Sequence, residues 1–317
     1  MPDLSVVVVN YNTREATAAC LRSVLQATGA VDLELIVVDN GSSDGSAAVL
    51  RERFPAAMVI EACENLGFAR GVNRGARAAS GKWLLLLNPD TITLPGSLRA
   101  LLQFADARPE FGVFGGRTLR RDGSVDPSSC WGAPTLWSMT MFATMLSTAF
   151  KRSPVFDPES LGHWQRDSVR EVPIITGCLL LIRKTDWDRL GGMDEDYFLY
   201  GEDAEFSLRA GRAGLRRVVV PEAVIVHEVG GSSDAGGEKG CMVMAGKVTH
   251  LRKTWSPLRA AIGVGLLLIG VAARAGLERA VGRSPAPWSH VWRRRADWRE
   301  GYPRAEETLF GRELAST

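Results

Sequence analysis

Polar side chains directly follow three apolar runs in the first third of the chain, in the groups Asn10–Asn12, Asp39–Asp44 and Asn88–Asp90. An acid at a strand end can accept hydrogen bonds from a nucleotide base or a ribose, and a Gly/Ser turn that opens a helix favours phosphate. A carboxylate such as Asp90 can hold a divalent cation, which in turn binds a diphosphate. The same residue types also form turns and helix caps, so both interpretations stay open here.

Five carboxylates lie between residues 194 and 203, and the last two are Glu202 and Asp203. Such a cluster is unfavourable unless it is solvated or balanced by a cation. Glu202 and Asp203 fall at the N-terminus of a predicted helix, where the helix dipole stabilises anions. An ionised Asp there can accept the proton of an attacking hydroxyl. The alternative is a solvated acidic loop with helix-favouring charges.

A single histidine, His227, follows the apolar residues 224–226. A neutral imidazole at a strand end can bind a metal ion, although a lone histidine is more often structural. The metal interpretation of His227 therefore depends on a partnership with Asp90.

Short β-branched runs alternate with helical segments through the first hundred residues. We expect strands at 4–9, 33–38, 58–61 and 83–87, separated by helices at 13–28, 46–54 and 67–80. This alternation predicts a doubly wound α/β sheet, in which ligands bind beyond the carboxyl ends of the strands. Further on we expect a strand followed by an inserted segment over the sheet within 112–175. We also expect a helix at 202–213, a loop from 230 to about 240, and strands at 174–183, 217–220 and 224–226.

Composition excludes several classes of protein. The chain has 317 residues, of which 45% are hydrophobic and 23% charged, as in soluble globular proteins rather than disordered or fibrous ones. The five cysteines are scattered without a CxxC pair, which argues against a disulfide framework or a cysteine zinc site and favours the cytosol. The first residues lack the pattern of a signal peptide.

The C-terminal tail differs in charge from the rest of the chain. Residues 1–246 carry 25 Lys and Arg against 30 Asp and Glu, whereas residues 247–317 carry 13 against 6. The tail contains an uncharged segment of 14 residues, 260–273, bracketed by Arg259 and Arg274, together with several Trp residues. This segment is shorter than the roughly 20 residues that span a bilayer, so we expect interfacial membrane attachment. The alternative is a buried core or dimer helix.

Taken in order, these pieces resemble the family 2 glycosyltransferases, which have the GT-A fold, a Rossmann-like, doubly wound mixed sheet. The similarity covers roughly residues 4–230 and rests on six segments and one histidine: 6–12, 37–46, 64–73, 84–90, 176–177, 191–209 and His227. The tail is most similar to the rhamnosyltransferase-like branch. The resemblance implies a glycosyltransferase domain over 1–240, with a nucleotide-sugar half to about 110 and an acceptor half from about 111, and a helical membrane-associating tail over 241–317.

The resemblance also implies roles for individual residues. Asp203 matches the catalytic base, with Glu202 in support, while Asp90 and His227 match the ligands of Mg²⁺ or Mn²⁺. Asn88 stands where the family's metal-binding motif has its first Asp, which weakens that motif. The residues expected to bind the nucleotide sugar are Asn10, Asn12, Asp39, Asn40, Asp44, Asn65, Gly67, Asn73, Asn88 and Arg209.

The implied activity is inverting transfer of a sugar from a nucleoside-diphosphate donor to a hydroxyl of a glycan or polyprenyl-linked acceptor in cell-surface polysaccharide assembly. dTDP-L-rhamnose is the first expected donor and a UDP-sugar the next. We expect a protein on the cytoplasmic face of the membrane, no nucleic-acid partner, and leave an oligomer open. The alternatives are a nucleotidyltransferase or similar nucleotide enzyme, and a catalytically silent sugar-nucleotide-binding or scaffold subunit. Dinucleotide and P-loop motifs are absent from the sequence.

Overall fold

The computed structural model describes residues 2–29, 31–227 and 236–310. The chain forms two compact units. The first unit comprises residues 1–131, 164–194 and 203–232, and the second comprises 132–163, 195–202 and 233–317. The second unit therefore contains the tail together with two segments from the middle of the chain.

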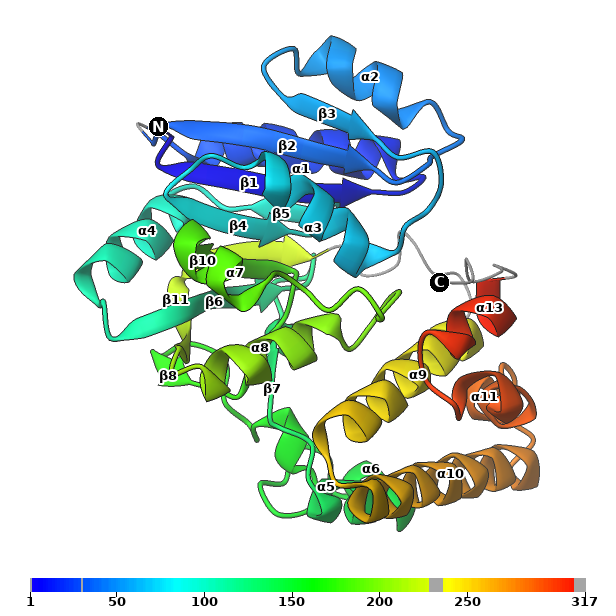
Figure 1. Ribbon diagram of the computed structural model, residues 1–317. Helices are drawn as coiled ribbons and strands as arrows, with labels where there is room; N and C mark the ends of the chain where they lie inside the picture. Colours follow the sequence, from blue (N-terminus) through cyan, green and yellow to red (C-terminus); the bar gives the residue numbers. More distant parts are fainter. Residues whose placement is uncertain (1, 30, 228–235, 311–317) are drawn as a thin grey trace. The chain divides into compact units, whose positions relative to one another are not determined.

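The first unit is built on a mixed sheet whose strands run in the order β3-β2-β1-β4-β10-β6-β11-β5, with β8 paired to β11 (Figure 1). The first four of these strands are parallel, and β10 runs antiparallel to both β4 and β6. The strands are β1 (Leu4–Asn10), β2 (Leu33–Asp39), β3 (Met58–Glu61), β4 (Trp83–Leu87), β5 (Thr91–Thr93), β6 (Phe111–Leu119), β8 (Arg170–Glu171), β10 (Leu179–Arg183) and β11 (Arg216–His227).

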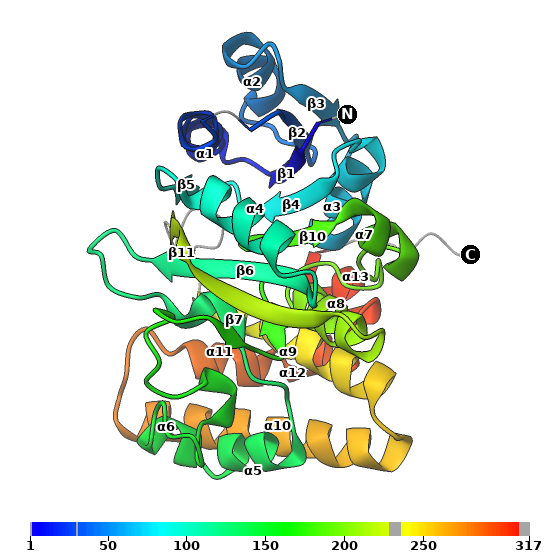
Figure 2. The same ribbon diagram turned by 90° about the vertical axis from the view of Figure 1, so that its left-hand side faces the viewer.

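Helices cover both faces of this sheet, as expected for a doubly wound fold (Figure 2). They are α1 (Arg14–Ala27), α2 (Ser46–Arg53), α3 (Phe68–Ala78), α4 (Ser97–Ala107), α7 (Lys184–Leu190) and α8 (Glu202–Arg212). Because side chains alternate along a strand, Val6 and Val8 join the buried cluster that contains residues of α1 and α4. Val7 and Val9 point to the other face, where α3 approaches so closely that a side chain at Gly71 or Gly75 would collide with them.

Two predicted strand boundaries are wrong. The apolar run 174–183 is not one strand, because it breaks at Thr176–Cys178 into β9 (Ile174–Ile175) and β10. β9 pairs with β7 (Cys130–Trp131) in a separate two-stranded sheet. A short helix, η1 (Pro127–Ser129), comes directly before β7. The segments 217–220 and 224–226 are instead one strand, β11, whose register against β6 shifts between Val220 and Val224. A bulge of this kind bends a strand without ending it.

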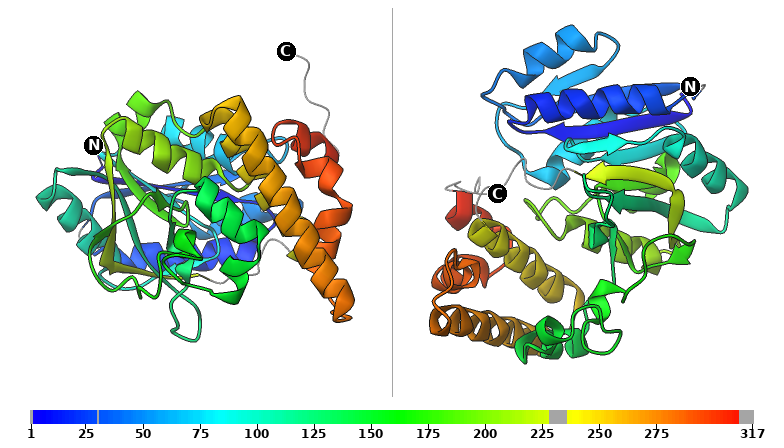
Figure 3. Two further views of the ribbon diagram at one scale, coloured as in Figure 1. Left: turned by 90° about the horizontal axis from the view of Figure 1, so that it is seen from below. Right: turned by 180° about the vertical axis from the view of Figure 1, so that it is seen from behind.

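The second unit is helical. Its elements are α5 (Leu136–Ala143), α6 (Leu146–Ala149), η2 (Pro158–Ser160), α9 (Gly236–Thr254), α10 (Pro257–Ala280), α11 (Pro287–Arg293), α12 (Arg295–Trp298) and α13 (Arg304–Phe310). α9, α10 and α11 pack side by side around a buried cluster that includes Leu267, Val271 and Trp298 (Figure 3). The loop expected up to about Gly240 is wrong in part, since α9 already begins at Gly236. The rest of that predicted loop, at 228–235, lies outside the described residues.

α10 is longer than its uncharged segment suggests, with 24 residues instead of 14. The helix continues past Arg274 because this side chain is buried and its charge is solvated by protein groups. The guanidinium donates hydrogen bonds to the carbonyl of Phe142 at 2.7 Å and to Thr148 Oγ1 at 2.7 Å. Among the described residues, α10 is the one helix whose length and composition would suffice to cross a membrane.

Candidate active site

The ends of β1 and β2 form the first part of the site. Asn10 and Asp39 are paired in the parallel register of these strands, so their side chains meet at one edge of the sheet. Asn10 is fully buried, and its amide donates to Asp39 Oδ1 at 2.6 Å and to Ser42 Oγ at 3.0 Å. The second oxygen of Asp39 accepts the backbone N–H of Ser42 at 3.2 Å. Asn10 therefore fixes the orientation of the Asp39 carboxylate.

Asn12 and Asp44 connect the loops that follow these two strands. Asn12 has a left-handed backbone (φ 53°), and its Oδ1 accepts the N–H of Ser43 at 2.8 Å. Asp44 accepts the N–H of Arg14 at 3.1 Å and that of Ser46 at 3.0 Å, so one carboxylate serves the N-termini of α1 and α2. Both residues rigidify the predicted donor pocket, and their contact with a nucleotide stays a prediction.

Asn40 binds the segment that leads into α3. Its amide donates to Asn65 Oδ1 at 2.9 Å and to the carbonyl of Gly67 at 3.0 Å. Its Oδ1 accepts the N–H of Leu66 at 3.0 Å. Gly41, with φ 76°, is needed here because a Cβ would lie 2.7 Å from the backbone of Glu64. The structure therefore brings Asn40, Asn65 and Gly67 together beside the end of β2.

Asn73 and Arg209 hold the segment after α7. Asn73 exchanges two hydrogen bonds with the backbone of Met193, at 2.8 and 2.9 Å. Arg209 donates to the carbonyls of Leu190 and Gly192, at 2.5 and 2.7 Å, and pairs with Glu205 at 2.8 Å. These contacts give both residues a positioning role for 190–193. None of these hydrogen bonds tests the predicted contact of Asn73 and Arg209 with the donor, which stays a prediction.

Asp90 and His227 are far apart in the sequence, but they meet at the same edge of the sheet. β5 pairs antiparallel with β11, and His227 stands opposite Thr91, the residue after Asp90. The register therefore places His227 Nε2 3.2 Å from Asp90 Oδ1. Both side chains are largely buried. The partnership on which the metal interpretation of His227 depends is present.

Asp126 completes this group and was missed by the sequence reasoning. It follows a turn after β6 and lies 4% exposed, with its Oδ2 3.8 Å from His227 Nδ1. The motif Asp122-Gly123 signals the turn, but only the pairing of β6 with β11 brings Asp126 to His227. Burial lowers the pKa of His227, yet the carboxylates of Asp126 and Asp90 outweigh burial and raise this pKa to about 9.

Asp203 is the third acidic group. The helix α8 begins at Glu202, as predicted. Glu202 is buried and Asp203 is half-buried, so the two are not part of a solvated loop. Asp203 Oδ2 accepts the N–H of Gly177 at 3.3 Å, and Oδ1 accepts that of Ala204 at 2.7 Å. Burial raises the pKa of Asp203 in spite of these backbone hydrogen bonds. A carboxylate with a raised pKa is a stronger base than an exposed one.

The turn Thr176–Cys178, which ends β9 and begins β10, links these groups. Gly177 donates to Asp203, while the carbonyl of Cys178 accepts the N–H of Asn88 at 3.4 Å. Burial raises the pKa of the Cys178 thiol to about 11, and the negative charges of Asp203 and Asp126 add to the effect. Cys178 is therefore within electrostatic reach of both carboxylates. A side chain at Gly177 would collide with the ring of Phe68, which explains the glycine.

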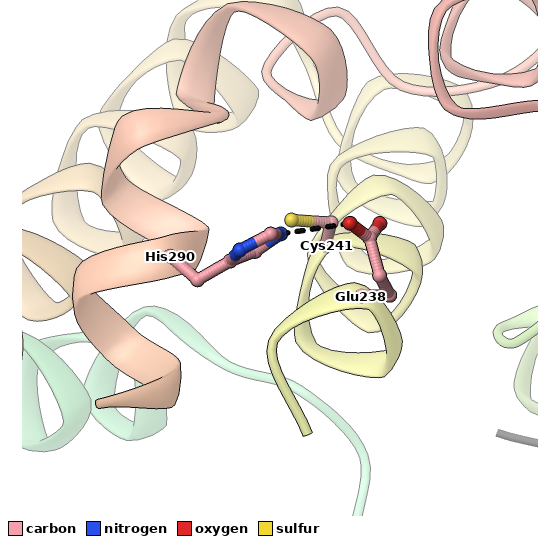
Figure 4. A group of neighbouring side chains, drawn as sticks. All are labelled: Glu238, Cys241 and His290. Atoms are coloured by element: carbon pink, nitrogen blue, oxygen red, sulfur yellow. Dashed lines mark ion pairs between the residues drawn. The ribbon is translucent and has the colours of Figure 1, made fainter. Parts of the chain in front are cut away.

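A second histidine–carboxylate group lies in the helical unit (Figure 4). Glu238 and Cys241 of α9 face His290 of α11, and their ligand atoms lie within 4.8 Å of one another. His290 Nε2 is 2.9 Å from Glu238, but Arg294 also binds both carboxylate oxygens of Glu238, at 2.8 and 3.0 Å. Burial raises the pKa of Cys241 to about 12, so this thiol is protonated at neutral pH. An internal guanidinium already balances the charge of this group.

Comparison with known proteins identifies the family. Residues 5–160 match the model of glycosyl transferase family 2, and residues 83–268 match that of glycosyl transferase family group 2. The chain is 33% identical to the N-acetylglucosaminyl-diphospho-decaprenol L-rhamnosyltransferase of Mycobacterium tuberculosis, over 71% of this chain and 75% of that protein. It is 27% identical to the O-antigen biosynthesis protein RfbC of Myxococcus xanthus, over 74% of this chain but 18% of that protein.

Solved structures confirm the fold. A mannosyltransferase from Pyrobaculum calidifontis, solved with GDP-Man and Mn²⁺, superimposes with a TM-score of 0.55 at 20% identity, covering 98% of this chain and 88% of that one. Residues 1–349 of TarS from Staphylococcus aureus give a TM-score of 0.51 at 17% identity, covering 88% and 74%. The mixed sheet and these neighbours confirm the predicted GT-A fold. The chain belongs to glycosyl transferase family 2, in its rhamnosyltransferase-like branch, and is a glycosyltransferase of cell-surface glycan synthesis.

Proposed function

We propose that this protein is a metal-dependent, inverting glycosyltransferase that uses dTDP-L-rhamnose, or failing that a UDP-sugar, and transfers the sugar to a hydroxyl of a glycan or polyprenyl-linked glycan. One observation carries the proposal. A half-buried carboxylate, Asp203, is connected through the turn Thr176–Cys178 to the strand end that holds Asp90 and His227. A base and a cation site thus share one edge of the sheet, where family 2 enzymes bind their donor.

The donor side of the proposal rests on Asp39. Its carboxylate is fixed by Asn10 and by the Ser42 N–H, and it lies at the end of β2. A carboxylate held in this way is suited to accept a hydrogen bond from the imide N–H of uracil or thymine, because little rotamer entropy remains to be lost on binding. The loops tied by Asn12 and Asn40 are then the walls of the base and ribose pocket.

The residues around Asp90 fit a divalent cation. A carboxylate oxygen and an imidazole nitrogen lie 3.2 Å apart, and this combination of donors suits Mn²⁺ and Mg²⁺. Asp90 and His227 would hold the ion, and the neutral Asn88 would contribute at most an amide oxygen. A bound divalent ion offsets the negative charge that develops on the departing diphosphate.

Asp203 is the proposed general base. Its raised pKa lets it take the proton of the acceptor hydroxyl while that oxygen attacks the anomeric carbon. The new glycosidic bond forms as the bond to the diphosphate oxygen breaks, on the opposite face of the sugar. No second nucleophile is assigned among the described residues of the site, so a single displacement with inversion follows.

The relatives support the substrates. The Mycobacterium tuberculosis relative is a rhamnosyltransferase whose acceptor is a diphospho-decaprenol-linked N-acetylglucosamine, by its name. A similar lipid-linked acceptor would bring this chain to the cytoplasmic face of a membrane, with no need of a nucleic-acid partner. The oligomeric state is left open.

α10 is the proposed membrane-binding element, and it would lie in the interface. Its buried side packs on α5, α9 and α11, and Arg274 on this side is held by α5 and α6. Its other side exposes the apolar residues Leu258, Ile262, Ile269 and Leu277, and Val281, directly after the helix, is exposed as well. The exposed cations Arg259, Arg279 and Arg283 flank this surface. Exposed apolar residues with cations at the ends are typical of helices that bind an anionic bilayer surface.

The direct test is binding of nucleoside diphosphates, with the thermal midpoint measured for UDP, dTDP, GDP and CMP in Mn²⁺ or in EDTA. We expect stabilisation by dTDP or UDP that requires Mn²⁺, because a ligand at about 100 times its Kd stabilises by about 2.7 kcal/mol. Transfer from the stabilising nucleotide's sugar to a lipid-linked acceptor then confirms activity. A protein that binds a nucleotide but never transfers sugar would instead be a silent subunit, an outcome that Asn88 makes worth testing.

A further inference from the structure

Two buried polar atoms of the cation site face one another without a hydrogen-bond partner among the described residues. They are Oδ2 of Asp126 and Nδ1 of His227, and they lie 3.8 Å apart. A buried polar atom without a partner is unfavourable by about 1–3 kcal/mol, so such a pair calls for an explanation. One is an acceptor, and the other becomes a donor when its nitrogen carries the proton. A movement of about 1 Å would bring them to hydrogen-bond distance.

The backbone holds Asp126 firmly in this place. Its N–H donates to the carbonyl of Thr118 at 2.9 Å, and its Oδ1 accepts the N–H of Ser128 at 3.0 Å. Oδ1 also lies 3.8 Å from the guanidinium of Arg120. Oδ1 is therefore occupied, and Oδ2 is the oxygen directed at the imidazole.

His227 thus stands between two carboxylates from different elements. Nε2 is 3.2 Å from Asp90, which comes just before β5, and Nδ1 is 3.8 Å from Asp126, which comes from the turn after β6. A histidine that binds a metal through one nitrogen almost always donates the other N–H to a carboxylate, a carbonyl or water, which fixes its tautomer and its ring orientation. The two nitrogens of His227 have the surroundings that this arrangement requires.

We propose that Asp126 is a positioning residue, which accepts the Nδ1–H of His227 and so keeps Nε2 free to bind a divalent cation beside Asp90. This inference rests on the proposed cation site. Asp126 would also supply the second negative charge, which the neutral Asn88 does not provide. With a neutral imidazole, Asp90 and Asp126 together balance the two charges of the ion.

The sharpest variant is Asp126→Asn. Its amide oxygen can still accept the Ser128 N–H, so its NH₂ group would point at His227 Nδ1 as a donor. A donor in that place favours the tautomer with the proton on Nε2, which cannot bind the ion. An Asp-to-Asn change beside a catalytic histidine has this effect in serine proteases, where the wrong tautomer is the cause of the loss. The matched control is Asp122→Asn, an exposed carboxylate in the same turn.

The experiment measures Mn²⁺ affinity by electron paramagnetic resonance with dTDP or UDP present, and the His227 tautomer by nitrogen NMR with diamagnetic Mg²⁺. A His227→Gln protein assigns the signal. We expect Asp126→Asn to weaken Mn²⁺ binding about 10–100-fold, the usual cost of losing such a partner, and to move the proton from Nδ1 to Nε2. Asp122→Asn should match the wild type in both.

Three results would overturn the proposal. Asp126→Asn could bind Mn²⁺ as tightly as the wild type. It could lose the ion while His227 keeps its proton on Nδ1, which would make Asp126 a direct ligand. The wild type itself could carry the proton on Nε2 with Mg²⁺ bound, a measurement that stays decisive even if the variant does not fold. A wild type that binds no Mn²⁺ at all would instead contradict the cation site of the proposed function.

Discussion

Each unit of this protein contains a histidine beside a carboxylate, and the two groups are balanced in different ways. In the first unit, His227 lies between Asp90 and Asp126, and the guanidinium of Arg120 is 3.8 Å from Asp126. In the second unit, Arg294 makes close charge-assisted bonds to Glu238 at 2.8 Å and to Asp297 at 2.7 Å. Two carboxylates beside one imidazole leave room for a divalent cation, whereas a carboxylate already bound by guanidinium does not.

This contrast gives a rule for recognising a cation site when no ion is seen. Residue types alone do not separate the two groups, since Glu238, Cys241 and His290 are metal-binding residue types at suitable distances. The two groups differ in the positive charge that lies beside their carboxylates. In the first unit the Asp90 carboxylate faces an imidazole and the guanidinium of Arg120 stays 3.8 Å from Asp126, whereas in the second unit Arg294 lies 2.8 Å from Glu238, whose carboxylate links α9 to His290 of α11.

The largest expected effect is on turnover. Asp203 is held by backbone N–H groups instead of a guanidinium, and it is the proposed base. General base catalysis contributes about 10²–10⁴-fold, so Asp203→Asn should lose at least ~100-fold in kcat while nucleotide binding survives. The control is Asp188→Asn, an exposed carboxylate on α7. Steady-state kinetics with a saturating donor would decide, and near-full activity in Asp203→Asn would remove the assignment.

A change in the exposed side of α10 should affect membrane binding and leave the first unit's chemistry intact. Replacing both Leu258 and Ile269 by Glu removes two large exposed apolar side chains, each of which contributes about 1.5–3 kcal/mol when buried. We expect at least ~10-fold weaker partition to vesicles of anionic lipid, measured by sedimentation, with unchanged activity on a soluble acceptor. Leu25→Glu, on the exposed side of α1, is the matched control. Equal partition of all three proteins would exclude α10 as the contact.

The pH dependence of Asp203 has a definite sign. Burial raises its folded pKa, so the acid limb of kcat/KM should lie above the ordinary aspartate value of about 3.9. The same shift means that folding favours the protonated form. Its stabilising effect is complete below the unfolded pKa and is lost as pH rises through the folded pKa. Asp203→Asn should therefore raise Tm at neutral pH, and the gain should disappear near pH 4. An acid limb at or below 3.9 would contradict this.

The smallest effect is expected from the second unit's group. Glu238→Gln breaks the half-exposed pairs with Arg294 and His290, and exposed pairs contribute about 0–1 kcal/mol. We expect Tm to fall by at most a few degrees, with Mn²⁺ binding and turnover unchanged. A loss of Mn²⁺ affinity in Glu238→Gln would break the contrast between the two groups.

The sequence predicted the donor half of the fold well, because its signals are local. Each of the first four strands is an apolar run that ends at a polar residue, and the structure places β1, β2, β3 and β4 at these runs. The parallel register then brings Asn10 to Asp39 without further information. Signals of this kind failed where strands continue through a bulge, as in β11, or break at a buried turn, as at Thr176–Cys178.

The missed parts of the site depend on contacts between distant segments. Asp126 and His227 are 101 positions apart by their numbers, and only the pairing of β6 with β11 joins them. The length of α10 was underestimated for a similar reason, because Arg274 looked like a helix boundary. The carbonyl and hydroxyl partners that allow this charge to be buried come from α5 and α6.

We expect the first unit's acid–histidine group, and not the second unit's, to bind a divalent cation together with the nucleotide. The most direct test is a Mn²⁺ titration with dTDP or UDP, followed by electron paramagnetic resonance, on the wild type, Asp90→Ala and Glu238→Gln. One nucleotide-dependent Mn²⁺ per chain is expected in the wild type and in Glu238→Gln, and none in Asp90→Ala. Unchanged Mn²⁺ binding in Asp90→Ala, or its loss in Glu238→Gln, would mean that the ion is bound elsewhere than between Asp90 and His227.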